Sequence, residues 1–119
     1  MDANSLKLKL DTCTRKWKGN IVQINGPWNV ESRAVFVHIN KPKQVDVFNM
    51  PDKRTTTVYD NTLWGQEESI KSYMPAIVQV CFEGDMTIDL IAEDVVDVTL
   101  GLNGITIDFG TYEIGLNKL

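Results

Sequence analysis

Four carboxylates in the second half of the chain, Asp89, Asp97, Asp108 and Glu113, are the residues whose chemistry is most suggestive. Paired carboxylates can cleave glycosides or hold hard cations. Calcium sites, however, gather six to eight oxygens within a glycine-containing loop, whereas these residues fall in segments with strand-like alternation. We therefore expect neither a metal site nor a catalytic pair here, and the sequence indicates no cofactor.

Other catalytic candidates are few. His38 is the only histidine, and it lies in an almost unbroken apolar run without a Ser or Cys nucleophile nearby in the sequence. A structural role therefore fits it better than acid–base catalysis. Cys13 and Cys81 lack zinc-site spacing and are either two free thiols or one disulfide. The sequence accordingly predicts a protein that is not an enzyme.

Alternating apolar residues predict the strands that carry the carboxylates. The run Ala76–Phe82 has one strongly apolar face, and Met86, Ile88 and Leu90 repeat the pattern. Both sets share a face if Phe82 opposes Met86, which leaves residues 83–85 as the loop. A third strand over residues 96–102 is expected beside the second, connected by Glu93 to Val95.

Two further turns complete this region. Asn103-Gly104 suits a two-residue type I′ turn, because both residues tolerate positive φ, and it would place Leu102 opposite Ile105. Gly110-Thr111 suits a type II′ turn that places Phe109 opposite Tyr112. The sequence thus predicts a five-stranded antiparallel meander over residues 76–116.

These registers bring polar side chains into one row on the opposite face. The predicted row runs through Gln79, Asp89, Thr99, Asp108 and Glu113, with Asp97 one row away. Asp108 would face Glu113 directly, and such a like-charge pair destabilises a sheet by roughly 0.2–1 kcal/mol. Two explanations stay open: a first strand bearing Lys7 and Lys9 neutralises the row, or the row docks a cationic partner.

The remainder of the chain predicts further strands and one short helix. The expected strands are residues 6–10, 21–24, 55–59 and a hairpin of 33–39 with 45–48, and the helix covers residues 65–74. We find no repeat or linker, so residues 1–119 are expected to be a single domain. The predicted fold class is all-β with that short helix, as an antiparallel sandwich or a partly closed barrel.

Composition narrows the class of protein. The 119 residues carry a formal net charge of −4, yet residues 1–54 hold ten Lys or Arg against five Asp or Glu, and residues 55–119 hold two against eleven. Dispersed basic residues and negative overall charge argue against nucleic-acid binding. No run has the length of a signal peptide or membrane span, so a cytoplasmic protein without membrane contact is expected.

These observations favour a non-catalytic protein-binding module. The preferred hypothesis is a small acidic intracellular inhibitor, such as the immunity protein of a bacterial toxin system, that occludes a basic partner such as a toxin nuclease. The expected contacts are the row carboxylates, with Trp64 as an apolar anchor. Alternatives are a carbohydrate-binding β-sandwich module, using exposed tryptophans, and a phage or virion structural component, using uncovered strand edges. The oligomeric state stays open. The full set of predicted partner-binding residues is Gln79, Asp89, Asp97, Thr99, Asp108, Glu113 and Trp64.

Overall fold

The computed structural model describes residues 1–27, 31–44 and 54–119. Trp28 and the strand predicted at residues 45–48 lie outside these ranges. The chain divides into two compact units, one of residues 1–43 and 76–119 and the other of residues 44–75. Each unit is described by itself below.

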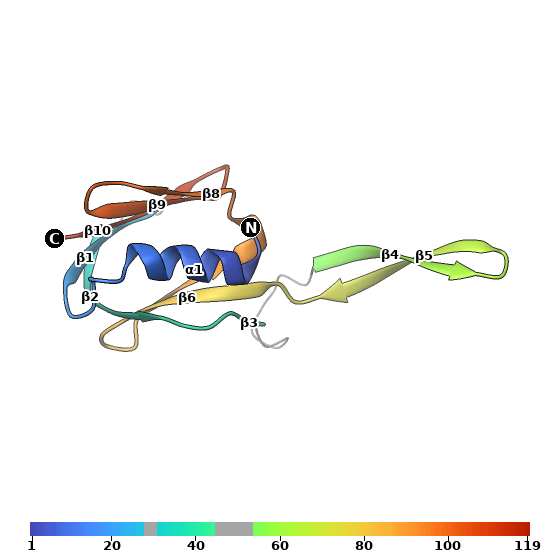
Figure 1. Cartoon of the computed structure of the whole chain (residues 1–119), viewed down its shortest axis with the longest axis horizontal. Coiled ribbons are helices and arrows are strands. Elements are labelled where there is room, and N and C mark those ends of the chain that lie inside the picture. The colour runs from blue at the N-terminus through green and yellow to red at the C-terminus, as the bar shows by residue number, and fades with distance from the viewer. Residues whose placement is uncertain (28–30, 45–53) are drawn as a thin grey trace. The chain divides into compact units, whose positions relative to one another are not determined.

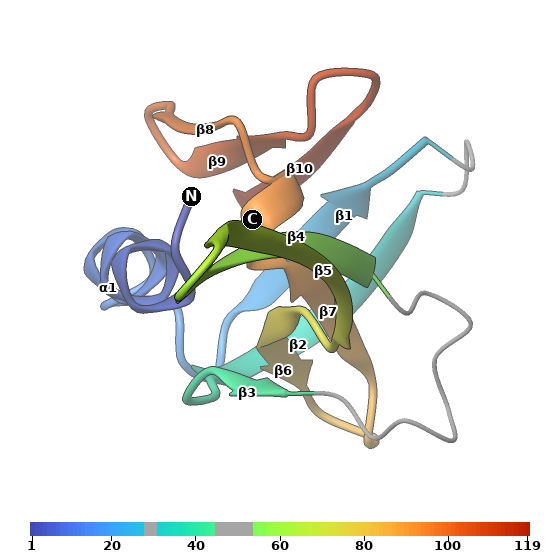
Figure 2. The ribbon, with the colours of Figure 1, turned by 90° about the vertical axis from the view of Figure 1, so that its right-hand side faces the viewer.

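The first unit confirms the all-β class and the partly closed barrel, because its antiparallel strands form a strongly curled half-barrel (Figure 2). The strands follow the spatial order β3-β6-β2-β1-β10-β9-β8. β7 lies off this path and pairs with the edge of β6 that faces away from β2. Their bounds are β1 Ile21–Asn25, β2 Ser32–Ile39, β3 Lys43–Gln44, β6 Ala76–Phe82, β7 Thr87–Ile91, β8 Asp97–Leu100, β9 Gly104–Asp108 and β10 Glu113–Lys118. A 3-10 turn, η1 Ala92–Asp94, separates β7 from β8.

The segment predicted as the first strand is instead helix α1, Ala3–Cys13. Asp2 caps its first turn by accepting the Ser5 backbone N–H at 2.9 Å. Leu6 and Leu10 are fully buried, whereas Leu8 is 69% exposed, which is helical rather than alternating periodicity. The prediction was wrong because a run of five alternating residues also contains an i, i+4 pair, here Leu6 and Leu10. The burial of these two leucines in the core favours a helix over a strand.

α1 lies along the concave side of the curled sheet and packs against β2, β6 and η1 (Figure 1). Edge-to-face aromatic contacts extend this core. The ring centroid of Phe36 lies 6.0 Å from that of Trp17 and 6.2 Å from that of Phe82. Among the described residues, no helix is long and apolar enough to cross a membrane. The buried core residues from the helix and sheet include Leu6, Leu10, Val22, Ile24, Phe36, Val78, Val80, Leu90, Val98, Ile105, Ile107, Ile114 and Leu116.

All five strands predicted over residues 76–116 are present, but they do not form one continuous meander. β6 and β7 pair as expected, with Val80 opposite Ile88 and Gln79 opposite Asp89. β8, β9 and β10 pair with one another, and β8 does not lie beside β7. The sheet instead continues from β6 through β2 and β1 to β10, so β7 and β8 are both edges. The predicted pairing of the second and third strands was wrong because η1 turns the chain away between them.

The turn between β8 and β9 lies one residue earlier than predicted, which shifts the register of the two strands by two residues. Leu100 pairs with Ile105, which places Leu102 and Asn103 at the turn in place of Asn103 and Gly104. Gly104 does not have positive φ. A Cβ atom there would lie 2.8 Å from the Leu116 carbonyl oxygen, so this glycine is required by the close approach of β10. By contrast, the Gly110-Thr111 turn is confirmed, with a positive φ at Gly110 and Ile107 opposite Ile114.

The second unit contains a two-stranded hairpin of β4, Arg54–Thr62, and β5, Gly65–Tyr73. The strand predicted at residues 55–59 is confirmed within β4. The helix predicted at residues 65–74 was wrong, because β5 forms nine consecutive pairs with β4. Ile70 and Met74 have helical spacing, but pairing with β4 determines the conformation of this segment. β4 is rich in threonine, whose β-branched side chain favours a strand.

Candidate functional site

Three carboxylates lie directly opposite one another on adjacent strands. Asp97 on β8 pairs with Asp108 on β9, and Asp108 pairs with Glu113 on β10. We call these three residues the acidic row. Asp97 was predicted one row away, and the two-residue shift of the β8–β9 register brings it into line. The same shift removes Thr99 from the row, because Thr99 pairs with Thr106.

The acidic row is only partly neutralised by the chain's own cations. Lys9 Nζ lies 3.6 Å from Asp97 Oδ1, and both side chains are substantially exposed. Lys7 instead pairs with Asp11 within α1. Among the described residues, neither Asp108 nor Glu113 forms an ion pair, and Asp108 accepts the Gly110 backbone N–H at 2.7 Å. The predicted neutralisation by Lys7 and Lys9 is therefore limited to one contact, made from a helix and directed at Asp97.

Gln79 and Asp89 belong to a separate polar network on β6 and β7. Gln79 Nε2 donates to Asp89 Oδ1 at 2.9 Å, and Asn40 Nδ2 donates to Gln79 Oε1 at 3.1 Å. His38 Nε2 in turn bonds Asn40 Oδ1. This network crosses β2, β6 and β7, so the side chain of Gln79 is engaged within the protein. The predicted single row thus divides into two, because β7 and β8 are not neighbours.

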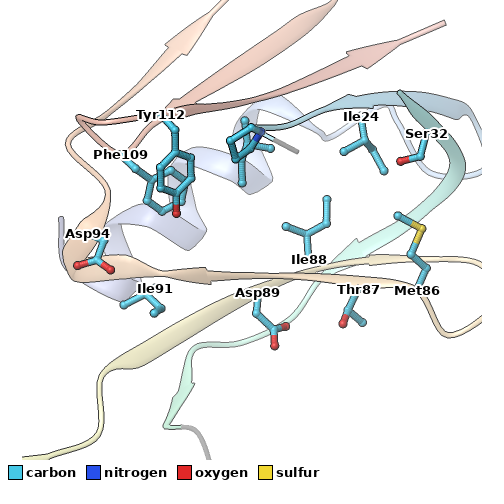
Figure 3. Close-up of a pocket in the computed structure, with 12 residues that line it drawn as sticks. Ile24, Ser32, Met86, Thr87, Ile88, Asp89, Ile91, Asp94, Phe109 and Tyr112 are labelled. Atoms are coloured by element: carbon cyan, nitrogen blue, oxygen red, sulfur yellow. The ribbon is translucent and has the colours of Figure 1, made fainter. Parts of the chain in front are cut away.

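A groove of about 600 Å³ opens beside β7 (Figure 3). Phe109 and Tyr112, on either side of the β9–β10 turn, stack with ring centroids 4.8 Å apart and form one end of it. Met86 and Ile88 of β7 point into the space, as Figure 3 shows. We call this feature the β7 groove. Its described lining is Ile24, Pro27, Ser32, Met86, Thr87, Ile88, Asp89, Ile91, Asp94, Phe109, Tyr112 and Ile114.

The polar part of the β7 groove is acidic or neutral. Asp89 and Asp94 are among its lining residues, and no Lys, Arg or His is among the described lining. Asp94 lies at the end near the aromatic stack, whereas Asp89 points to the other side of β7 (Figure 3). The groove therefore has an apolar interior, and the charge of Asp89 lies on the opposite face of β7, which suits a ligand that is apolar on one side and cationic on the other.

The edge of β7 that borders the groove is not paired in the described structure. The Phe82 N–H donates to the Met86 carbonyl at 2.9 Å, and hydrogen-bonded pairs alternate along an antiparallel ladder. Ile88 and Leu90 therefore direct their N–H and C=O groups toward β6. Thr87, Asp89 and Ile91 direct theirs away from β6, toward the open edge.

Trp64 lies at the tip of the β4–β5 hairpin in the second unit and is 98% exposed. Leu63 beside it is fully exposed, at 100%. Trp17, in contrast, is a core residue of the first unit. Sequence reasoning placed Phe109 opposite Tyr112 correctly but did not assign the pair to a binding surface, and it did not identify Leu63.

Side chains with catalytic potential are not gathered at either surface. His38 is exposed on β2 and held by Asn40, and both cysteines are free thiols. Burial raises the pKa of both thiols; at Cys81 the charge of Lys43 opposes this rise in pKa and the smaller effect of Asp89 adds to it. Within the described ranges, no group of three or more His, Cys, Asp or Glu side chains is placed to hold a metal ion.

Comparison of the chain with protein-family models, curated proteins and solved structures finds no match.

Proposed function

We propose that this protein is a non-catalytic binding module that occludes a basic protein partner, as an inhibitor or immunity protein occludes a toxin nuclease. The observation that carries the proposal is the acidic row, in which Asp108 and Glu113 form no ion pair within the described structure. Direct apposition of like charges destabilises the free protein, and a cationic partner relieves that repulsion.

The position of the acidic row supports the same proposal. Side-chain alternation along β9 and β10 places Asp108 and Glu113 on the sheet face opposite to the buried Ile107 and Ile114, so the carboxylates point away from the core. Charges on such an open face increase the rate of encounter with a cationic partner.

Charge reversal tests the proposal. The protein is used to isolate a partner, and the binding of that purified partner is measured for the double variant Asp108→Lys, Glu113→Lys. We expect the partner to be basic and its affinity for the protein to fall as the salt concentration rises. The double variant should bind the partner about 100-fold more weakly or worse, since charge pairs at interfaces are worth several kcal/mol.

The matched control is Glu83→Lys, Asp85→Lys, which makes the same change in net charge on exposed residues of the β6–β7 loop. It should bind nearly as well as the unaltered protein. Circular dichroism and thermal unfolding confirm that each variant is folded. If the lysine variant does not fold, the milder Asp108→Asn, Glu113→Gln variant is measured in its place. A partner that binds the row variant and the control equally, without salt dependence, contradicts the proposal.

A second candidate function, a structural component of an assembly such as a virion, is favoured by the β4–β5 hairpin. Its tip exposes Leu63 and Trp64, and each nine-residue strand has one unpaired edge within the described structure. Such edges and apolar tips are the features that assembly covers. Light scattering over a range of concentrations tests this: self-association that Leu63→Ser, Trp64→Ser abolishes supports it, and a monomer at every concentration contradicts it.

The carbohydrate-binding alternative has less support. It requires several tryptophans on one exposed face, and of the two that the structure describes only Trp64 is exposed. Asn61 and Gln66 pair across the strands near that tip and supply amides, but one aromatic platform makes a weak sugar site.

A further inference from the structure

We propose that the β7 groove binds an extended segment of the partner, which adds to the sheet as a strand along the free edge of β7 and alternates apolar with basic side chains. This inference rests on the proposed function and specifies the form of the basic partner at this site. Three independent features of the groove carry it: the backbone, the apolar lining and the charge.

The backbone provides the first feature. Thr87, Asp89 and Ile91 direct N–H and C=O groups toward the open edge, and no described strand pairs with them. An incoming strand satisfies these groups with the same ladder geometry that β6 uses on the other edge. Five residues of β7, at about 3.4 Å each, accommodate a segment of about the same length.

The apolar lining provides the second feature. Side chains of an added strand alternate between its two faces, so every other residue enters the space beside Met86 and Ile88. The Phe109–Tyr112 stack forms one end of that space, and Ile114 also lines it. The residues on this face of the bound segment are therefore apolar.

Charge provides the third feature and defines the other face of the segment. Asp89 points away from the groove interior (Figure 3), on the side of β7 where the remaining side chains of an added strand lie. Within the described structure Asp89 forms no ion pair, and its hydrogen bond is made with the neutral Gln79. Lys or Arg is thus the favoured residue type opposite Asp89, and Asp or Glu is disfavoured.

The probe that tests this inference is a synthetic nonapeptide, acetylated and amidated, that alternates Lys with Val. One comparison peptide has Glu in place of Lys, and a second has the same composition with the lysines and valines in separate blocks. Binding to the full chain is measured by titration calorimetry at low salt. We expect the alternating Lys peptide to bind about tenfold or more tightly than either comparison peptide.

Two variants locate the binding site. Thr87→Pro removes an N–H that faces the open edge but leaves the bonds to β6 in place, and it should weaken peptide binding about tenfold. Leu100→Pro is its matched control: Leu100 lies on the edge strand β8 with its N–H directed away from β9, and this variant should bind as the unaltered protein does. Asp89→Asn keeps the contact with Gln79, removes the charge, and should weaken only the Lys peptide, about threefold.

Backbone amide exchange gives a readout that does not depend on a variant. The amides of Thr87, Asp89 and Ile91 should become protected when the alternating Lys peptide binds, while those of β8 stay unchanged. The inference is overturned if the block peptide binds equally well, if Thr87→Pro has no more effect than Leu100→Pro, or if these three amides gain no protection.

Failure of this inference is distinguishable from failure of the proposed function. The peptide assay leaves the acidic row intact, and the charge-reversal assay leaves β7 intact. A partner that requires Asp108 and Glu113 but ignores Thr87→Pro supports the function and rejects strand addition. A peptide that binds β7 while no basic partner depends on the row supports strand addition and rejects the function as stated.

Discussion

Asp2 shows how one exposed side chain sets the start of α1. Hydrogen bonds from the Ser5 side chain and backbone lower the pKa of its carboxyl below the ordinary value of 3.8. Because this pKa is depressed by folding, the stabilisation is present above about pH 3.8 and is lost as the pH falls through the folded value. Asp2→Ala should therefore lower the midpoint of thermal unfolding at pH 7 and change it little near pH 2.

Asp2→Asn is the matched control for this cap, since asparagine accepts the same backbone N–H without the charge. Its unfolding midpoint at pH 7 should lie between those of the unaltered protein and the alanine variant. Thermal unfolding followed by circular dichroism measures all three. Equal midpoints at pH 7 for the alanine variant and the unaltered protein contradict the assigned cap.

The two thiols provide a second prediction at the scale of the residue. Burial is the main cause that raises the pKa of both Cys13 and Cys81, so each holds less thiolate at neutral pH than a free cysteine. Both should react more slowly with a disulfide reagent than glutathione does, and Cys81, only 8% exposed, more slowly than Cys13. The single variants Cys13→Ser and Cys81→Ala assign the two phases.

The same thiols make stability depend on alkaline pH. The unfolded chain releases thiol protons near the ordinary value of 9.0, whereas the folded chain retains them to higher pH. The free energy of unfolding should consequently fall as the pH rises above about 9, and less so in the double variant that lacks both thiols. Reaction as fast as that of glutathione, or a stability that rises over this range, contradicts the burial of these groups.

At the same scale, glycine chemistry explains where register could be predicted and where it could not. Gly110 has the positive φ that its turn requires, and the pairing of Asp108 with Glu113 follows from it as predicted. Gly104 is a glycine because β10 passes too close for a side chain, a contact that connects residues distant in sequence. Local turn preference identifies the first kind of glycine and misassigns the second.

The helix α1 is the element whose assignment is easiest to test. In a strand, Leu8 and Leu10 would share a face, whereas in α1 Leu10 is fully buried and Leu8 is largely exposed. Leu10→Ala should lower the free energy of unfolding by about 2–5 kcal/mol, as other buried leucines do. Leu8→Ala should change it by no more than about 0.5 kcal/mol. Urea denaturation of both variants measures the difference, and equal losses indicate a strand.

Elements were predictable from the sequence where one pattern excluded the other. Alternation and turn residues predict strands β1, β2, β4, β6, β7, β8, β9 and β10. The two errors, at residues 6–10 and 65–74, fall where short runs fit both periods. In the first, long-range packing of Leu6 and Leu10 decides for a helix, and in the second, pairing with β4 decides for a strand.

The division into two units is a property of the whole molecule. An isolated two-stranded hairpin is only marginally stable in water, whereas the first unit has its own buried core. Replacing residues 45–74 by a glycine-serine linker should therefore leave the first unit folded, with a cooperative urea transition close to that of the full chain. Circular dichroism and urea denaturation measure this, and loss of the transition shows that the units depend on each other.

The order of strands in the sheet was the least predictable part of the structure. The register of β6 with β7, and of β9 with β10, follows from turns of two or three residues. The placement of β1 between β2 and β10 depends on contacts between distant segments, for which the sequence has no local signal. As a result, the predicted single row of polar residues is two separate groups, one around Asp89 and one on β8 to β10.

The pairing of β1 with β10 has a consequence for biosynthesis. Val22 lies opposite Lys118, and this ladder is the only link within the described sheet between the strands β7, β6 and β2 and the strands β9 and β8. Before β10 leaves the ribosome, β1, β2, β6 and β7 can pair with one another, but β8 and β9 have no connection to them within the described sheet. Completion of the sheet therefore requires β10, and until it is available the unpaired edges of β1 and β9 are substrates for chaperones.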